Sequence, residues 1–216
     1  KDIGEFENTV IMFMSDNGAS AEQIIRGDEH DPSAKPGSGD TFLCLGPGWS
    51  TSSNTPFRLH KTWVHEGGIS TPLIVHWPQG IKAEGELRHD QGHLIDILPT
   101  VLDIAGINIS EAQSESSPEF PGQSLLPSFK KYNSIDREFL YFHHRGNRAL
   151  RKDDWKLVAR GAEGPWKLYD LSEDRCECNN LADEYPEKVE ELNQRWRKCE
   201  RSFKSQAGVN DIDVND

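Results

Sequence analysis

The chain has 216 residues and a formal net charge of −12, with 24 basic and 36 acidic side chains. This acidic balance argues against a nucleic-acid partner, because phosphate binding needs clustered lysine and arginine. No apolar run approaches the length of a membrane span. Residues 1–6 are neither a signal peptide nor a start at methionine, which leads us to expect a piece of a longer protein.

The first half alternates short apolar runs with long polar segments. Residues 9–14 form a continuous apolar run, which predicts a strand buried on both faces, as in a parallel sheet. Residues 27–56 are rich in glycine and proline and predict a long structured loop, of a length that is often functional. A second strand is predicted over 73–77, where Pro78 ends it.

A helix is predicted over 94–105, where apolar residues recur with a 3.6-residue period and Gly106 provides a stop. Pro99 inside this segment predicts a kink or a fresh start of the helix. Residues 108–124 are rich in serine, glutamate and proline and predict a surface linker.

The pattern changes after the linker. Four short strands are predicted, over 138–143, 148–151, 155–160 and 166–171, and they suggest a small antiparallel sheet. Pro186 then opens a last helix that runs to about residue 203.

The cysteines are Cys44, Cys176, Cys178 and Cys199. The Cys-x-Cys pair at 176 and 178 differs from the Cys-x-x-Cys of redox and zinc sites, and no suitably spaced histidine pair accompanies it. We therefore interpret these residues as a loop disulfide or as thiols.

Asp16 and Asn17 directly follow the first strand. A carboxylate beside a carboxamide supplies the hard oxygen ligands that calcium or magnesium prefers, although the same residues also form ordinary turns at strand ends. Lys61 precedes the paired glycines Gly67 and Gly68, whose backbone allows a tight turn. Its ammonium is placed to meet an anionic group, although a solvated loop lysine is the commoner case.

Taken together, these segments resemble the arylsulfatase family of the alkaline-phosphatase-like superfamily. The similar segments, in the order of the family, are Ser-Asp-Asn-Gly at 15–18, Gly-Pro-Gly-Trp at 46–49, Asn-Thr-Pro-Phe-Arg-Leu-His-Lys at 54–61, His-Glu-Gly-Gly-Ile at 65–69, and those at 93–100, 122–126, 147–151, 155–158, 168–171 and 180–182. The resemblance therefore runs nearly from end to end.

The resemblance implies the carboxyl-terminal part of a sulfatase fold, which is α/β. It predicts part of the mixed sheet of the catalytic domain over 1–130, and a small subdomain of an antiparallel sheet and a terminal helix over 131–216. The Cys/Ser-x-Pro-x-Arg sequence, from which sulfatases make their formylglycine nucleophile, does not occur among the 216 residues. We therefore expect the nucleophile in a missing amino-terminal half, which would be this chain's partner.

Site residues follow from the resemblance by position. Asp16 and Asn17 match the family's calcium-binding pair, and Lys61 matches the lysine that contacts the sulfate. His60 stands where relatives usually have tyrosine, which is expected to alter local packing. Three further residues are candidates to contact the substrate: His144, Trp49 and His93. Each also has a structural alternative. His144 could pack between the small sheet and the main domain, Trp49 could close its own loop, and His93 could cap a helix.

The implied reaction is hydrolysis of a sulfate ester by a calcium enzyme with a formylglycine nucleophile, acting on a sulfated small molecule or glycan outside the cytoplasm. One alternative is a phosphodiesterase or phosphonate hydrolase of the same superfamily. The two-metal enzymes of that superfamily, however, carry Asp-His where this chain has Asp16 and Asn17. The other is a non-catalytic binding module. We expect the 216 residues alone to be inactive, because they lack the nucleophile.

Overall fold

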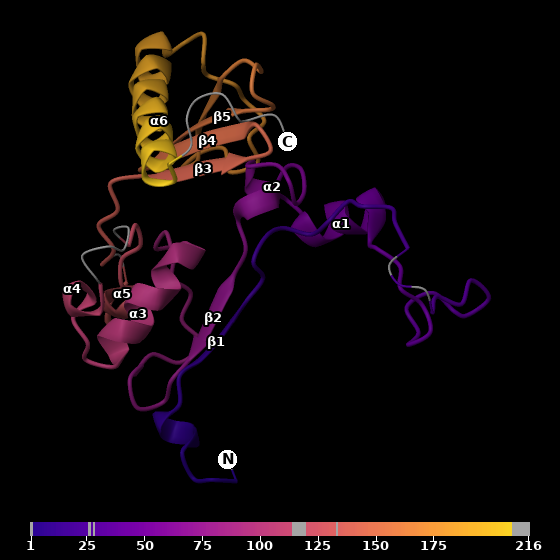
Figure 1. Cartoon of the computed structure of the whole chain (residues 1–216), viewed down its shortest axis with the longest axis vertical. Coiled ribbons are helices and arrows are strands. Elements are labelled where there is room, and N and C mark those ends of the chain that lie inside the picture. The colour runs from indigo at the N-terminus through magenta and orange to yellow at the C-terminus, as the bar shows by residue number, and fades with distance from the viewer. Residues whose placement is uncertain (1, 26, 28, 114–119, 133, 209–216) are drawn as a thin grey trace. The chain divides into compact units, whose positions relative to one another are not determined.

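The computed structural model describes residues 2–25, 27, 29–113, 120–132 and 134–208 (Figure 1). Its helices and strands, in chain order, are η1 (Phe6–Asn8), β1 (Ile11–Met14), α1 (Gly46–Asn54), α2 (Glu66–Ile69), β2 (Leu73–His76), η2 (Leu94–Asp96), α3 (Ile97–Ile104), α4 (Ile109–Ala112), α5 (Leu126–Lys130), β3 (Leu140–His144), β4 (Asn147–Lys152), β5 (Trp155–Ala159), β6 (Lys167–Asp170) and α6 (Pro186–Gln206), where η marks a 3-10 helix. Across these ranges, every helix is too short or too polar to cross a membrane.

The chain divides into two compact units that interleave along the sequence. The first contains Lys1–Met14 and Pro72–Leu140, and the second contains Ser15–Thr71 and Tyr141–Asp216. The division into a catalytic part over 1–130 and a subdomain over 131–216 stays a prediction.

In the first unit, β1 pairs with β2 in an antiparallel ladder, in which Phe13 lies opposite Ile74. The observed partner strand is thus antiparallel and not parallel as expected, and the described residues cover only one face of β1. Phe13 is 70% exposed and Ile74 is 60% exposed, whereas Met12 packs against the core. The apolar run indicates a strand, but strand direction and the covered face depend on which segments pack beside it.

The core of this unit gathers under α3 and α5, where Leu125, Leu126 and Phe129 are buried. The helix predicted over 94–105 is in fact the 3-10 turn η2 followed by α3. Pro99 is the third residue of α3, a position in the first turn where its missing N–H removes no helical hydrogen bond. The α-helix thus starts afresh at Ile97, two residues before Pro99, which agrees with the second of the two alternatives predicted for this proline only to within the first turn. The predicted linker contains α4, and its residues 114–119 lie outside the described part of the chain.

The second unit contains the four-stranded sheet in the order β3-β4-β5-β6 (Figure 1). The pairs β4–β5 and β5–β6 are antiparallel, and α6 packs against β4 and β5 with Leu192 and Trp196 buried. All four strands and the last helix were predicted within a few residues of their observed bounds. Local alternation of apolar residues was sufficient here, because consecutive strands pair with each other.

Helix α1 lies inside the segment predicted as a loop. Glycine, proline and serine are weak helix formers, so the sequence of α1 contains no helical signal. The helix is held instead by tertiary contacts, since Ser50 is fully buried and the carboxamide of Asn54 is hydrogen-bonded to Ala19 and Leu59. The four cysteines form no disulfide, and each lies in the described ranges.

Candidate functional site

Main-chain hydrogen bonds bring together the two segments in which the sequence placed the site. The amide of Gly18 donates to the carbonyl of Gly68 at 2.9 Å, and the amide of Lys61 donates to the carbonyl of Ala19 at 3.1 Å. The carboxamide oxygen of Asn54 accepts from the amide of Ala19 at 2.8 Å. The backbone after β1 is therefore joined to the backbone around Lys61 within one unit.

The paired glycines are required by close packing inside the Lys61 segment itself. A β-carbon on Gly67 would lie 2.3 Å from the carbonyl oxygen of Leu59, and one on Gly68 would lie 2.0 Å from that of Trp63. Both distances are shorter than any real contact, so only glycine fits. The expectation of a tight turn at Gly67 and Gly68 is confirmed.

Asp16 is exposed, Asn17 is half-buried and Lys61 is exposed. Among the described residues, none of these three side chains has a hydrogen-bond or ion-pair partner. The side-chain oxygens of Asp16 and Asn17 are hard donors that suit a divalent cation such as calcium. The donor chemistry thus fits the metal that the family resemblance implies.

Asp16 and Asn17 do not make a complete metal site by themselves. Within the described ranges, no group of three or more histidine, cysteine, aspartate or glutamate side chains is placed to hold a metal ion. Calcium takes six to eight oxygen ligands. Further ligands would therefore have to come from main-chain oxygens, water or another part of the protein.

The backbone on both sides of Lys61 adopts the left-handed region, with φ of 67° at Leu59 and 91° at Thr62. This conformation is unfavourable for a leucine and still more for a β-branched threonine. The carbonyl of Thr62 accepts from the side-chain amide of Asn147 at 3.1 Å. The strained segment is thus held by a contact from β4.

His60 packs inside this segment. Its Nδ1 lies 2.6 Å from the hydroxyl of Ser50 on α1. Its ring also meets the edge of Trp63, with ring centroids 6.2 Å apart. The residue that differs from the usual tyrosine of relatives therefore links α1 to the Lys61 segment.

The three candidates for substrate contact lie in different places. Trp49 is 72% exposed on α1, and His144 is exposed at the end of β3, both in the unit that contains Asp16. His93 belongs to the other unit, where its Nδ1 accepts from the amide of Ile95 and caps η2. Burial lowers the pKa of His93. A role for any of them in substrate binding stays a prediction.

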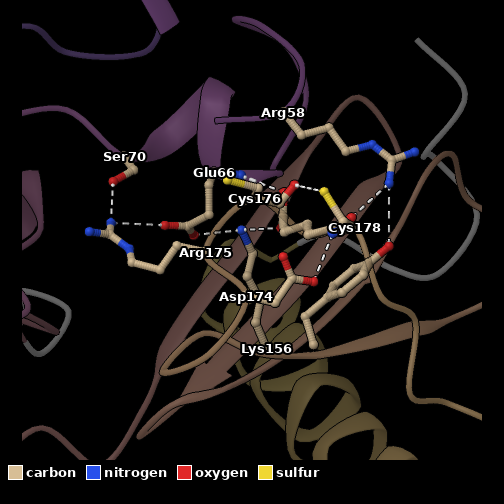
Figure 2. Close-up of polar contacts among 10 residues, drawn as sticks. Arg58, Glu66, Ser70, Lys156, Asp174, Arg175, Cys176 and Cys178 are labelled. Carbon is tan, nitrogen blue, oxygen red and sulfur yellow. Dashed lines mark hydrogen bonds and ion pairs between the residues drawn. The ribbon is translucent and has the colours of Figure 1, made fainter. Parts of the chain in front are cut away.

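One cluster of charged residues was missed at the sequence level (Figure 2). The ammonium of Lys156 lies 2.8 Å from Glu66 Oε1 and 2.8 Å from Glu177 Oε1. The side chains of Lys156 and Glu177 are 0% exposed, and that of Glu66 is 2% exposed. The only signal was a lysine within the apolar strand Trp155–Ala159, which is a weak indication of a buried charge.

The two carboxylates respond differently to this environment. Burial raises the pKa of Glu66, but Lys156 together with Arg151 and Arg175 more than offsets this, and the pKa lies below its ordinary value. For Glu177, burial outweighs the attraction of Lys156 and raises the pKa. Burial, reinforced by the positive charge of Lys156, lowers the pKa of His65 to about 3. His65 is therefore neutral in this charged surrounding.

Comparisons with known proteins agree along the chain. The model of the family described as N-sulphoglucosamine sulphohydrolase, C-terminal, matches residues 57–202. The model of the family described as Sulfatase matches residues 1–107. The two matches overlap over residues 57–107.

Two curated relatives and one solved structure illustrate the similarity. An uncharacterized sulfatase of Schizosaccharomyces pombe is 32% identical, over 91% of this chain and 38% of its own length. The N-acetylgalactosamine-6-sulfatase of Mus musculus is 27% identical, over 84% of this chain and 29% of its own length. A sulfatase from a study of glycosaminoglycan metabolism by Bacteroides thetaiotaomicron has the same fold, with a TM-score of 0.67 and 22% identity over 92% of this chain and 40% of that one.

The chain spans about a third of the length of these curated relatives. Its two family models nevertheless cover the β1–β2 segment, the Lys61 loop, the small sheet and most of α6. On this evidence the chain belongs to the sulfatase family.

Proposed function

We propose that the protein containing this chain hydrolyses sulfate esters, and that the chain supplies part of the metal and sulfate site. The observation that carries the proposal is the hydrogen bond from the amide of Lys61 to the carbonyl of Ala19. This bond joins the segment of Asp16 and Asn17 to that of Lys61. Within the described part of the chain, no other residue pairs with these three side chains, so they remain available to a ligand.

The three side chains have complementary roles in this proposal. Asp16 and Asn17 would hold a calcium ion, which when bound would supply positive charge to stabilise the sulfate oxygens. Lys61 contributes a second positive charge, which binds the sulfate group and neutralises the charge that develops as the ester bond breaks. The strained backbone at Leu59 and Thr62 holds Lys61 in a defined place.

A carboxamide at position 17 favours one hard cation over a pair of zinc or manganese ions. Zinc and manganese sites with two metals commonly recruit histidine, whose nitrogen is a softer donor. We therefore prefer a calcium sulfatase to a two-metal phosphodiesterase or phosphonate hydrolase.

We propose a sulfated glycan or smaller sulfated sugar as the substrate. The mouse relative is named N-acetylgalactosamine-6-sulfatase, and Trp49 presents an exposed ring in the same unit as the proposed site. An exposed tryptophan suits the apolar face of a sugar ring. His144 is a further candidate contact. Members of the family that the sequence resembles are mostly exported or lysosomal. We therefore propose that the protein lies outside the cytoplasm.

The nucleophile and the remaining metal ligands would come from polypeptide outside residues 1–216. The first unit also has an apolar face that such polypeptide would cover, since Ile11, Phe13 and Ile74 are exposed on one side of β1 and β2. A sheet of two strands is marginally stable by itself. We propose that an amino-terminal half of the same protein packs there and carries a formylglycine made from cysteine or serine.

The test compares the full-length gene product with the 216-residue chain, using p-nitrophenyl sulfate. We expect turnover by the full-length protein and none by the shorter chain. Asp16→Ala and Lys61→Ala should each lower kcat/KM by about a hundredfold or more. Lys35→Ala, which alters another exposed lysine of the same unit, serves as the control and should change little.

Three outcomes would contradict the proposal. They are full activity in the Asp16→Ala and Lys61→Ala variants, turnover by the 216-residue chain alone, and two zinc ions per molecule in metal analysis of the active protein. Urea unfolding of both proteins tests the apolar face, because Phe13→Ser should destabilise the full-length protein more than the shorter chain.

A further inference from the structure

The buried charged cluster joins three segments of the second unit that are far apart in the sequence. Lys156 lies on β5, Glu66 is the first residue of α2, and Glu177 lies in the loop between β6 and α6. Figure 2 shows the Lys156 side chain reaching from the sheet toward the carboxylate of Glu66. The cluster therefore links the sheet to the loop that precedes β2.

Glu177 is held pointing into the protein by its own loop. Its backbone is left-handed, with φ of 57°. The carboxylate of Asp174 accepts from the amides of Cys178 and Asn179, each at 2.7 Å, and so fixes the chain that follows Glu177. The Cys-x-Cys segment, for which the sequence suggested a disulfide or thiols, serves here to turn Glu177 inward.

Glu177 contacts the Lys61 loop in two further ways. Its Oε2 accepts from the amide of Glu66 at 3.0 Å. Its main-chain carbonyl accepts from the guanidinium of Arg58 at 3.0 Å. Arg58 and Glu66 lie on either side of Lys61 in the sequence, so both ends of this loop are bound to one residue.

The next contacts lead from Glu66 to the proposed metal ligands. Gly67 follows Glu66 and donates its amide to the carbonyl of Arg58 at 2.8 Å, which closes the loop around Lys61. Gly68 accepts from the amide of Gly18, the residue after Asn17. A displacement of Glu66 would therefore move both the backbone of the Lys61 loop and the backbone beside Asn17.

Ionic contacts are an inefficient way to stabilise a core, because removing charges from water costs about as much as their attraction returns. Apolar side chains of the same volume would fill this space equally well. Ionic contacts and hydrogen bonds are directional, whereas apolar packing is not. The contacts of Lys156 and Glu177 therefore hold the Glu66 side chain in one orientation. Arg175, 3.4 Å from Glu66 Oε2 and 3.1 Å from the hydroxyl of Ser70, holds it from the outer side.

We propose that Lys156 and Glu177 are positioning residues, which act through Glu66 to hold the loop of Lys61 and the backbone beside Asn17 in the geometry for ligand binding. The positioning of the backbone stands on the contacts alone, and its consequence for calcium rests on the function proposed above. Neither residue would touch substrate or metal.

The test uses the full-length protein that contains this chain and two variants of it, Lys156→Met and Glu177→Gln. Lys156→Met removes the shared cation and is the more disruptive change. Glu177→Gln keeps the shape and leaves Lys156 paired with Glu66, so it should fold even if the first variant does not. Amide hydrogen exchange, measured at Gly18, Lys61 and Gly68 and along the β4–β5 ladder, reports local loosening in each folded variant.

We expect exchange at these three amides to rise at least threefold in Glu177→Gln and more in Lys156→Met, with the β4–β5 amides little changed in Glu177→Gln. Lys152→Met is the matched control, because it removes a lysine from the same sheet whose 2.8 Å ion pair with Glu191 is exposed. It should leave the three amides unchanged. Calcium titration calorimetry should show at least fivefold weaker binding in Glu177→Gln and no more than a twofold change in Lys152→Met.

Unchanged exchange at the three amides in Glu177→Gln, or an equal rise throughout the unit, would overturn the positioning role. The expected exchange pattern together with no calcium binding by the unaltered full-length protein would support the positioning role and instead refute the assignment of Asp16 and Asn17 as calcium ligands. The two proposals therefore fail in different ways.

Discussion

A β-carbon added to Gly18 would lie 1.8 Å from the main-chain carbonyl oxygen of Gly67. The obstacle is backbone, which cannot rotate aside like a side chain. Gly18 and Gly67 thus allow the backbone that follows Asn17 to approach the turn that follows Lys61. The proposed ligands depend on this approach, because the hydrogen bond from Gly18 to Gly68 exists only at this separation.

Gly18→Ala should therefore separate the two segments. We expect a loss of about 2 kcal/mol or more in the free energy of unfolding, in the range known for overpacked sites, and weaker calcium binding by calorimetry. Gly48→Ala is the matched control, since a β-carbon there meets nothing within 4 Å. Gly48 lies in α1, so its replacement should leave stability unchanged or slightly higher. Equal stability of Gly18→Ala and the unaltered chain would contradict the close approach.

The contact between Ser50 and His60 predicts a second effect at the Lys61 segment. Ser50→Ala leaves the half-buried Nδ1 of His60 without its 2.6 Å partner, which should cost about 1–2 kcal/mol in urea unfolding. Ser53→Ala, on the same helix, removes only an exposed bond to the carbonyl of Trp49 and should cost much less. If both variants lose the same stability, His60 does not connect α1 to the loop.

His65 predicts a dependence of stability on pH. Its pKa is about 3 in the folded chain, because burial and nearby positive charges disfavour its protonated form. An unfolded histidine has a pKa of about 6.5, so between pH 6.5 and 3 the unfolded state binds a proton that the folded state does not. The free energy of unfolding must then fall as the pH falls through this window.

Urea unfolding at pH 7.5 and pH 5.0 measures this effect. His65 should account for a loss of about 2 kcal/mol between the two values, at about 1.4 kcal/mol per pH unit below the unfolded pKa. In His65→Gln that part of the loss should vanish, while His144→Gln, at an exposed site, should behave like the unaltered chain. A loss of the same size in His65→Gln would show that His65 is protonated while folded.

Asp96 predicts the largest loss in the first unit. Its fully buried carboxylate accepts from the amides of His93 and Gln123 and pairs with Arg137. Asp96→Ala leaves these donors without their acceptor and should cost roughly 3–5 kcal/mol. Glu86→Gln removes a more exposed partner of Arg88 and should cost less than about 1 kcal/mol. Similar losses in the two variants, measured by thermal unfolding, would contradict this account.

Much of the fold followed from local patterns. The strands β3 to β6 pair with their neighbours in sequence, and α6 has a clear apolar face that packs on them, so local alternation and helical periodicity were enough. Helix α1 was missed because its glycine, proline and serine residues form a helix only through the contacts of Ser50 and Asn54. The direction of β1 was wrong because an apolar run does not specify its neighbour.

In the candidate site, too, some residues could be predicted from the sequence and others could not. Asp16, Asn17 and Lys61 were singled out because their residue types and neighbours match family motifs, and their proposed roles still await the experiments above. Lys156 and Glu177 were missed, because nothing in the sequence of β5 tells which of its side chains is enclosed, nor that a loop residue would turn inward to meet it.

The sequence by itself determined the family, the order of the strands and helices in the small sheet, and the donor chemistry of the proposed ligands, because these depend on residue type and short-range periodicity. Only the tertiary structure decided that the backbone after β1 lies against the turn at Gly67, and that Lys156 holds two carboxylates from separate loops. Such contacts join residues far apart in the chain. They depend on whether two backbones can approach and which charges become buried together, and neither is written in a local pattern.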